Sequence, residues 1–252
     1  MAFIGSYSIK QRQEIMNNAF AKEFRDEFGE QIDKRIRVIV EPDKLNKQRF
    51  LFSDAILFGL GDDKLKEEGE KTLIRVGKIF VEHREIYDRI YIEGHTDNLS
   101  INTERFPSNW ALSSARATSV IQLFIDKFPL FKKNPRLLTA TGYGEYLPIA
   151  QNPPDGFTLL FSVSQEFQTE LNKNTLPNKL RQEFANHKIT LSQNTINSVK
   201  KIDKDTWQVD DEQQVYIIRK KEAKLNIYVK GQPLNRRIEI VVEYASETEQ
   251  KP

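Results

Sequence analysis

The strongest constraint on the fold is an alternation between short apolar strands and long amphipathic helices. Four strands are expected, at Arg37–Glu41, Arg89–Glu93, Leu137–Thr141 and Arg237–Tyr244. A further extended stretch is expected at 50–58, after the first of these strands. Apolar residues at helical spacing predict helices over 64–83 and 108–128. Strands separated by helices of this length predict an α+β or α/β sandwich, with the helices on one face of the sheet.

A long segment interrupts this alternation before the last strand. Loops without structure seldom exceed about 15 residues in compact domains, so the segment is expected to fold. It has a helix-like stretch at 179–187, a weaker one at 191–199, and two runs typical of a β-ribbon, 206–209 and 215–228. The expected division of the chain is a stalk or linker helix at 1–35, a main domain at 36–152 and 235–245, an inserted α+β subdomain at 153–234 and a disordered tail at 246–252.

The first part of the chain predicts a charged amphipathic helix over residues 8–35, with Phe20, Phe24 and Phe28 among its apolar positions. Two alternatives remain open for it. The helix either docks on the main domain or forms a juxtamembrane or dimerising stalk. No run in the sequence reaches the roughly 18 to 20 apolar residues that span a bilayer.

Composition limits the class of partner. The chain has 38 Lys+Arg against 36 Asp+Glu, and the net charge of +2 argues against a surface built to cover nucleic acid or anionic membrane. It has no cysteine, which excludes disulfides, thiolate metal sites and cysteine nucleophiles.

The most informative stretch is the loop and helix that follow the strand at 89–93. Asp97 comes just beyond the strand end, and Asn109, Ser113 and Arg116 share one polar face of the helix. The opposite side of the helix carries an apolar stripe: Trp110, Ala117, Ile121 and Phe124. Asp97 can accept from an ammonium group and Arg116 can bind a carboxylate through two hydrogen bonds, which suits a zwitterionic group. From the pattern alone, a structural bridge between Asp97 and Arg116 is an equal alternative.

Several ordered motifs go beyond these separate patterns: LFSDAILFGLGDDKLKEEGEKTL, IEGHTDN, RFPSNWALSSARA, GYGEYLPIAQN and NRRIEIVVE. On these motifs the chain resembles the OmpA-like peptidoglycan-binding family, over Phe52–Asn152 and Asn235–Glu243. The run RFPSNW before LSxxRA resembles the MotB-like members, which are flagellar stator subunits, more than the outer-membrane anchors.

The resemblance implies a βαβαβ domain of the α+β class, with helices packed on a mixed sheet, which binds the peptide stem of peptidoglycan without cleaving it. The Asp and Arg that hold the diaminopimelate group in this family correspond to Asp97 and Arg116. Five further positions in matching motifs are expected to shape the pocket: Thr96, Asn98, Asn109, Asn235 and Arg236. Asn235 and Arg236 could equally cap the last strand.

The resemblance also implies partners and a location. MotB-like proteins form homodimers, pair with a MotA-like membrane channel subunit and anchor the stator of an ion-driven motor to the cell wall. Because they have one N-terminal membrane helix, we expect this sequence to be the periplasmic part of an inner-membrane protein, with that helix upstream of Met1. Contact with membrane is expected only through that helix, and contact with nucleic acid is not expected. The alternatives are the anchor subunit of a non-flagellar ion-driven complex, such as an antiphage defence system, and an OmpA/Pal-type outer-membrane structural anchor.

No catalytic, metal-binding or cofactor-binding constellation is expected. His95 lies in the HTDN loop without a second histidine or carboxylate at metal spacing. Ser113 and Ser114 lack the strand–turn–helix context of an esterase nucleophile. The chain is therefore expected not to be an enzyme, and a peptidoglycan hydrolase is the weakest alternative.

Overall fold

The structure, a computed structural model, describes residues 7–29, 36–40, 46–151, 157–173, 175–187, 189, 191, 199–210 and 215–244. The chain divides into two compact units. The first comprises Met1–Ile149 with Leu234–Pro252, and the second comprises Ala150–Pro233. The second unit is thus inserted into the sequence of the first.

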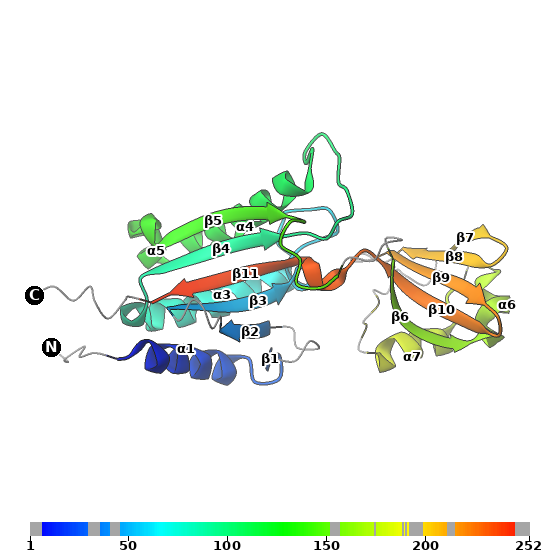
Figure 1. The fold of residues 1–252 in the computed structure, drawn as a ribbon, viewed down its shortest axis with the longest axis horizontal. Coiled ribbons are helices and arrows are strands. Elements are labelled where there is room, and N and C mark those ends of the chain that lie inside the picture. The colour runs from blue at the N-terminus through cyan, green and yellow to red at the C-terminus, as the bar shows by residue number, and fades with distance from the viewer. Residues whose placement is uncertain are drawn as a thin grey trace, which may run out of the picture. The chain divides into compact units, whose positions relative to one another are not determined.

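A six-stranded mixed sheet forms the centre of the first unit (Figure 1). The order is β1-β2-β3-β11-β4-β5, with bounds Phe28–Gly29, Ile36–Val40, Lys47–Ser53, Arg237–Glu243, Arg89–His95 and Leu138–Gly144. β1 pairs with β2, and β4 with β5, in parallel, whereas the other neighbours are antiparallel. The strand that comes last in the sequence, β11, therefore lies between β3 and β4.

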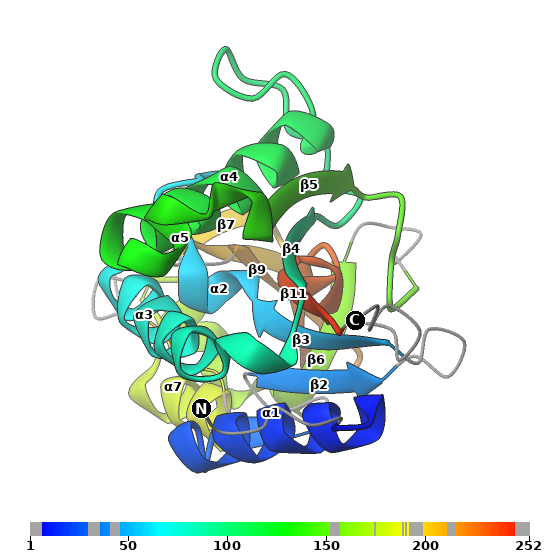
Figure 2. The same cartoon turned by 90° about the vertical axis from the view of Figure 1, so that its left-hand side faces the viewer.

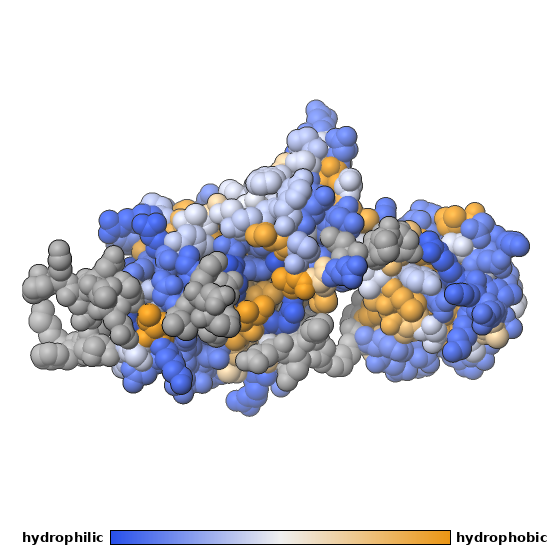
Figure 3. Space-filling view, viewed as in Figure 1, coloured by the Kyte–Doolittle hydropathy of each residue, from blue (hydrophilic) through white to orange (hydrophobic). Residues whose placement is uncertain are grey.

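Helices cover one face of this sheet (Figure 2). They are α1 (Ile9–Glu23), α3 (Glu67–Glu82), α4 (Asn109–Lys127) and α5 (Pro129–Lys133). Alternate strand residues point toward them, so Phe50, Ile92 and Ile240 share one core with Val76 of α3 and Val120 of α4. The other face of the sheet is turned to the viewer in Figure 3, where hydrophobic residues lie among hydrophilic ones.

The predicted α+β class, with helices packed on one face of a mixed sheet, is confirmed. The helix expected over 64–83 corresponds to α3. The extended stretch expected over 50–58 is wrong in its second half, where a short helix, α2 (Asp54–Leu57), follows β3. Phe58 N–H donates to the carbonyl oxygen of Asp54 at 2.9 Å and closes one helical turn, which a run of apolar residues does not reveal.

The N-terminal helix packs on the sheet. α1 begins with a capping box at Ser8, in which side chain and backbone satisfy each other. Met16 and Phe20 are fully buried, and the ring of Phe20 stacks on that of Phe50 in β3 with centroids 3.9 Å apart. The apolar side of α1 is therefore part of the core of the first unit.

Of the two alternatives left open for the N-terminal helix, the packing of α1 favours docking on the main domain, and α1 ends at Glu23 rather than near 35. Residues 1–6 and 30–35, like the tail expected at 246–252, lie outside the described residues. Over the described ranges, no helix is both long enough and apolar enough to cross a bilayer.

The second unit is a five-stranded antiparallel sheet with its own core. The order is β6-β10-β9-β8-β7, with bounds Phe157–Ser164, Lys224–Lys230, Val215–Lys221, Thr206–Asp210 and Val199–Asp203. Two helices, α6 (Gln168–Leu171) and α7 (Asn178–Asn186), pack against the sheet, where Leu180 and Phe184 of α7 share the core with Trp207. The predicted β-ribbon runs correspond to β8, β9 and β10, whereas β6 and β7 were not predicted.

The docking of α1 can be tested by Phe20→Ala. Because the ring is fully buried, its loss is expected to lower the free energy of unfolding of the first unit by about 3 to 5 kcal/mol. Lys22→Ala, at an exposed position of the same helix, is the control and should change it by less than about 0.5 kcal/mol. Hydrogen exchange of β3 peptides in urea reports on this unit alone. Equal protection in Phe20→Ala and in the wild type would restore the stalk interpretation.

Candidate ligand-binding site

Helix α4 lies close to β4 and β5 because glycines face it. A Cβ atom at Gly94 would lie 2.1 Å from the carbonyl oxygen of Ser113, and one at Gly142 would lie 2.2 Å from Ser114 Oγ. Neither strand position leaves room for a side chain. This contact holds the first turns of α4 beside the loop that follows β4, in which Asp97 lies.

Asp97 and Arg236 form a buried ion pair. Asp97 Oδ2 lies 3.5 Å from Arg236 Nε, and the two residues are 3% and 6% exposed. Asp97 Oδ1 also accepts a hydrogen bond from Leu99 N–H at 3.2 Å. Arg236 comes directly before β11, so the pairing of β11 with β4 brings its guanidinium to a loop far earlier in the sequence.

Arg116 is equally buried and binds other partners. Its Nε donates to the carbonyl oxygen of Asp62 at 2.8 Å, and its Nη2 to that of Gly59 at 3.1 Å. Its Nη1 lies 3.0 Å from Asp54 Oδ1. Burial lowers the pKa of Arg116, which the charge of Asp54 opposes. Arg116 thus ties α4 to the turn that leads into α3.

The structure therefore pairs Asp97 with Arg236 and Arg116 with Asp54, rather than Asp97 with Arg116. The two pairs are neighbours. Burial raises the pKa of Asp54, and the charges of Arg116 and Arg236 both oppose this rise. Sequence reasoning missed Asp54, although a single acid between two apolar runs was a signal for it.

Two further predicted residues hold the loop. The Nδ2 group of Asn109 donates to the carbonyl oxygens of Asp97 and Leu99, at 3.2 and 3.0 Å, and to Glu145 Oε2 at 2.5 Å. Thr96 N–H donates to the carbonyl oxygen of Gly144 at 2.8 Å. Thr96 Oγ1 is buried and has no hydrogen-bond partner in the described part of the chain.

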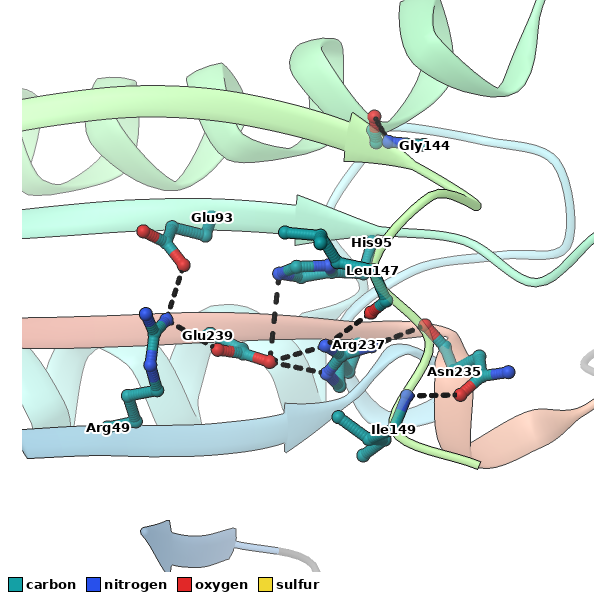
Figure 4. Close-up of polar contacts among 10 residues, drawn as sticks. Arg49, Glu93, His95, Gly144, Leu147, Ile149, Asn235, Arg237 and Glu239 are labelled. Atoms are coloured by element: carbon teal, nitrogen blue, oxygen red, sulfur yellow. Dashed lines mark hydrogen bonds and ion pairs between the residues drawn. The ribbon is translucent and has the colours of Figure 1, made fainter. Parts of the chain in front are cut away.

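The remaining two predicted residues, Asn98 and Asn235, are chain neighbours of Asp97 and Arg236. Asn98 is exposed. Asn235 is fully buried, and its Oδ1 accepts a hydrogen bond from Ile149 N–H at 2.9 Å (Figure 4). Its carbonyl oxygen accepts one from Arg237 at 3.1 Å. Asn235 therefore joins the two chain segments of the first unit that flank the insertion.

The faces of α4 differ from those expected. Asn109, Ser113 and Arg116 do share one face, but this polar face is buried. Ser113 Oγ donates to the carbonyl oxygen of Trp110 and accepts from Gly144 N–H. Trp110, assigned to the apolar stripe, is 55% exposed. It lies in the first turn of α4, beside the residue at which β5 ends, so the sheet does not extend beneath it.

A second buried network lies on the face of the sheet that the helices do not cover (Figure 4). Arg49 of β3 binds Glu93 of β4 at 2.5 Å and Glu239 of β11 at 2.7 Å. Arg237 binds Glu239 through Nε and Nη2, at 2.6 and 2.5 Å, and donates to the carbonyl oxygen of Leu147. The network joins three strands to the segment that follows β5.

His95 lies in this network. The expectation that no carboxylate stands at metal spacing beside it is wrong. Glu93, His95 and Glu239 offer ligand atoms within 4.8 Å of one another, which is close enough for a metal ion. Sequence spacing missed this group because Glu239 comes from a distant strand. Arg49 and Arg237 already neutralise the two carboxylates, so a divalent ion would bring uncompensated charge into the interior. We therefore interpret the group as an ion-pair network.

The environment of His95 keeps its ring neutral. Both ring nitrogens are buried and have no hydrogen-bond partner among the described residues, and the ring stacks on Tyr143. Burial and the charge of Arg237 lower the pKa of His95 from 6.5 to about 4, although Glu239 opposes this shift. Nε2 lies 3.7 Å from Glu239 Oε1, which is beyond hydrogen-bond distance.

Comparison with known proteins agrees with this geometry. Residues 57–156 match the model of the OmpA family. The uncharacterized protein YtxE of Bacillus subtilis is 37% identical over 102 residues, which are 40% of this chain and 40% of that protein. Motility protein B of Bacillus subtilis is 33% identical over 122 residues, 48% of this chain and 44% of that protein. The chain thus matches less than half the length of either curated relative.

A solved structure extends the likeness to the fold. A protein from Desulfovibrio vulgaris described as MotB-like has a TM-score of 0.51 at 18% identity, with 94% of this chain and 96% of that chain covered. At this identity the likeness concerns the fold alone.

The fold and the buried charges define an α+β module with a polar site where β4 meets the N-terminal part of α4. Within the chain, residues 57–156 are similar to an OmpA family domain. The predicted resemblance to that family and to its MotB-like members is confirmed.

The buried His95 predicts a pH dependence of stability. Because its pKa is lower in the folded chain, the unfolded chain binds a proton that the folded chain does not between pH 6.5 and about 4. The free energy of unfolding should therefore decrease as the pH is lowered through this window, by up to about 1.4 kcal/mol per pH unit from this group. His95→Gln should flatten that slope, and His83→Gln, at a helix end, should not. Urea unfolding at about pH 7 and pH 5 measures the difference, and parallel slopes in wild type and His95→Gln would contradict it.

Proposed function

We propose that the first unit binds the peptide stem of peptidoglycan, without cleaving it, at the zwitterionic end of its diaminopimelate residue. The observation that carries this proposal is the buried pair of Asp97 and Arg236, whose closest atoms lie 3.5 Å apart. This separation is longer than the about 2.7 to 2.9 Å of a charge-assisted N–H···O hydrogen bond. A zwitterion can enter the pair by exchange, with its ammonium on Asp97 and its carboxylate on Arg236.

Neighbouring groups support the same ligand. Thr96 Oγ1, which has no hydrogen-bond partner in the described part of the chain, belongs to the residue before Asp97. The N-terminus of α4, capped by Ser108, carries the positive end of the helix dipole and favours a carboxylate nearby. Arg116, whose charge Asp54 balances, holds the turn at Gly59 and Asp62. In this proposal Asp97 and Arg236 touch the ligand, and Arg116 positions them.

We further propose that this binding anchors a stator subunit of an ion-driven motor to the cell wall. The identity of 33% to Motility protein B supports this role. It entails a location in the periplasm next to the inner membrane, a MotA-like channel partner and a homodimer. The insertion, which has a core of its own, favours a specialised complex outside the flagellum as the second candidate. An OmpA/Pal-type outer-membrane anchor would use the same site.

The binding role can be tested by Asp97→Asn, which keeps the shape of the side chain and removes its charge. Because Asp97 would hold the ammonium group, affinity for a soluble stem tripeptide that contains diaminopimelate should fall about tenfold or more, and retention on isolated sacculi should fall with it. Arg236→Gln should have a similar effect through the carboxylate. Titration calorimetry and pull-down with sacculi measure the two quantities.

The matched control is Glu104→Gln, which removes an exposed negative charge from the same loop. It should leave both measurements unchanged. Wild-type affinity in folded Asp97→Asn and Arg236→Gln would exclude the proposed site, and release of soluble fragments from sacculi by the wild type would contradict binding without cleavage.

A further inference from the structure

Two aromatic side chains lie exposed beside the candidate site. Trp110, in the first turn of α4, is 55% exposed, and Tyr146, just after β5, is 66% exposed. Their ring centroids lie 5.5 Å apart, with the planes at 45°. Large aromatic side chains that stay in contact with solvent, side by side, form the kind of patch that marks a binding surface.

The backbone of the site itself holds the two rings together. Asn109 and Glu145, the residues immediately before Trp110 and Tyr146, are hydrogen bonded at 2.5 Å. Gly144 has a φ of +57°, and a Cβ atom there would lie 3.4 Å from Trp110 N and 3.5 Å from Tyr146 Cδ2. The left-handed turn at Gly144 thus brings Tyr146 to the first turn of α4. These contacts are made by the neighbouring residues and the backbone, so much of the surface of each ring stays exposed to solvent.

The aromatic pair is continuous with the site around Asp97. Asn109 donates to the carbonyl oxygen of Asp97 as well as to Glu145, so a single side chain connects the two places. The aromatic pair and the loop of Asp97 therefore belong to one hydrogen-bonded assembly.

We propose that Trp110 and Tyr146 form a sugar-binding subsite, which packs against the C–H face of an N-acetylhexosamine ring of the glycan strand. The inference rests on the proposed function, since the sugar and the stem peptide would belong to the same polymer. A pyranose ring has an apolar face and a rim of hydroxyl groups. The indole N–H of Trp110 and the phenol of Tyr146 add polar groups to two apolar ring faces, which suits both features.

The size of the patch favours a sugar over a protein. A stable protein–protein interface buries about 800 Å² on each partner, whereas one aromatic side chain buries about 150 to 250 Å². Two rings cover one or two sugar units but supply only part of a protein interface. A second copy of this chain or another protein at this place is therefore an outcome that the experiment has to separate.

The experiment compares three ligands: a disaccharide–tripeptide muropeptide, the tripeptide alone, and glycan strands freed of peptide by an amidase. The variants are Trp110→Ala, Tyr146→Ala and the double variant, with Trp110→Phe as the conservative change. We expect the double variant to lose about tenfold in affinity for the muropeptide and its retention on glycan strands, and to keep wild-type affinity for the tripeptide. Trp110→Phe should retain most of the binding. Leu159→Ala, which removes an exposed apolar side chain from the second unit, is the matched control and should behave as wild type.

The outcomes separate this inference from the proposed function. Loss of tripeptide binding in Asp97→Asn, together with unchanged muropeptide and glycan binding in the double variant, would overturn the sugar subsite alone. If glycan strands retain the wild-type chain but not the double variant, the subsite is supported, even where Asp97→Asn does not change the affinity for the tripeptide. A change of oligomeric state in the double variant, without a change in glycan or muropeptide binding, would assign the rings to a protein interface and overturn the proposal.

Discussion

The contact of α4 with the glycines of β4 and β5 is the constraint on which the site depends. With no side chain at Gly94 or Gly142, the helix backbone lies directly on the strands. This close approach of α4 to the strands lets Ser113 reach the backbone of Gly144 and lets Asn109 reach the carbonyl oxygens of the loop after β4. One turn further along, Arg116 reaches the turn before α3. A single packing distance thus positions every predicted α4 residue of the site.

The second organising feature is the burial of charge in balanced groups. Two ion pairs, Asp54–Arg116 and Asp97–Arg236, are almost wholly removed from water. On the face of the sheet that the helices do not cover, Arg49 and Arg237 balance the charges of Glu93 and Glu239. Buried ion pairs contribute little net stability, but the loss of one partner leaves a charge without compensation. Such groups hold the side chains of the candidate site in one geometry, and a preorganised site lowers the entropic cost of binding.

Local patterns predicted the fold well and the site only in part. Strands that end at glycines and helices with apolar periodicity were visible because neighbouring residues determine them. The HTDN loop and the helix face of Arg116 were located for the same reason. The pairing was missed because Arg236 and Glu239 arrive through β11, and Asp54 through a helical turn hidden in an apolar run. Periodicity assigned Trp110 to the wrong side because it gives the direction of a side chain but not the point at which the sheet ends. It also did not distinguish a docked α1 from a stalk.

The position of β11 has a consequence for how the protein is made. This strand lies between β3 and β4, yet it is synthesised only after all of the second unit. While the ribosome translates residues 150–233, the first unit has a sheet with its central strand missing, and Asp97 has no Arg236 to face. Domains generally fold as units, and in the folded second unit β6 pairs with β10, which places Phe157 opposite Lys230. Once folded, it no longer behaves as a long flexible loop, and the entropic cost of bringing β11 back between its neighbours falls. Folding of the insertion thus favours completion of the sheet in the first unit.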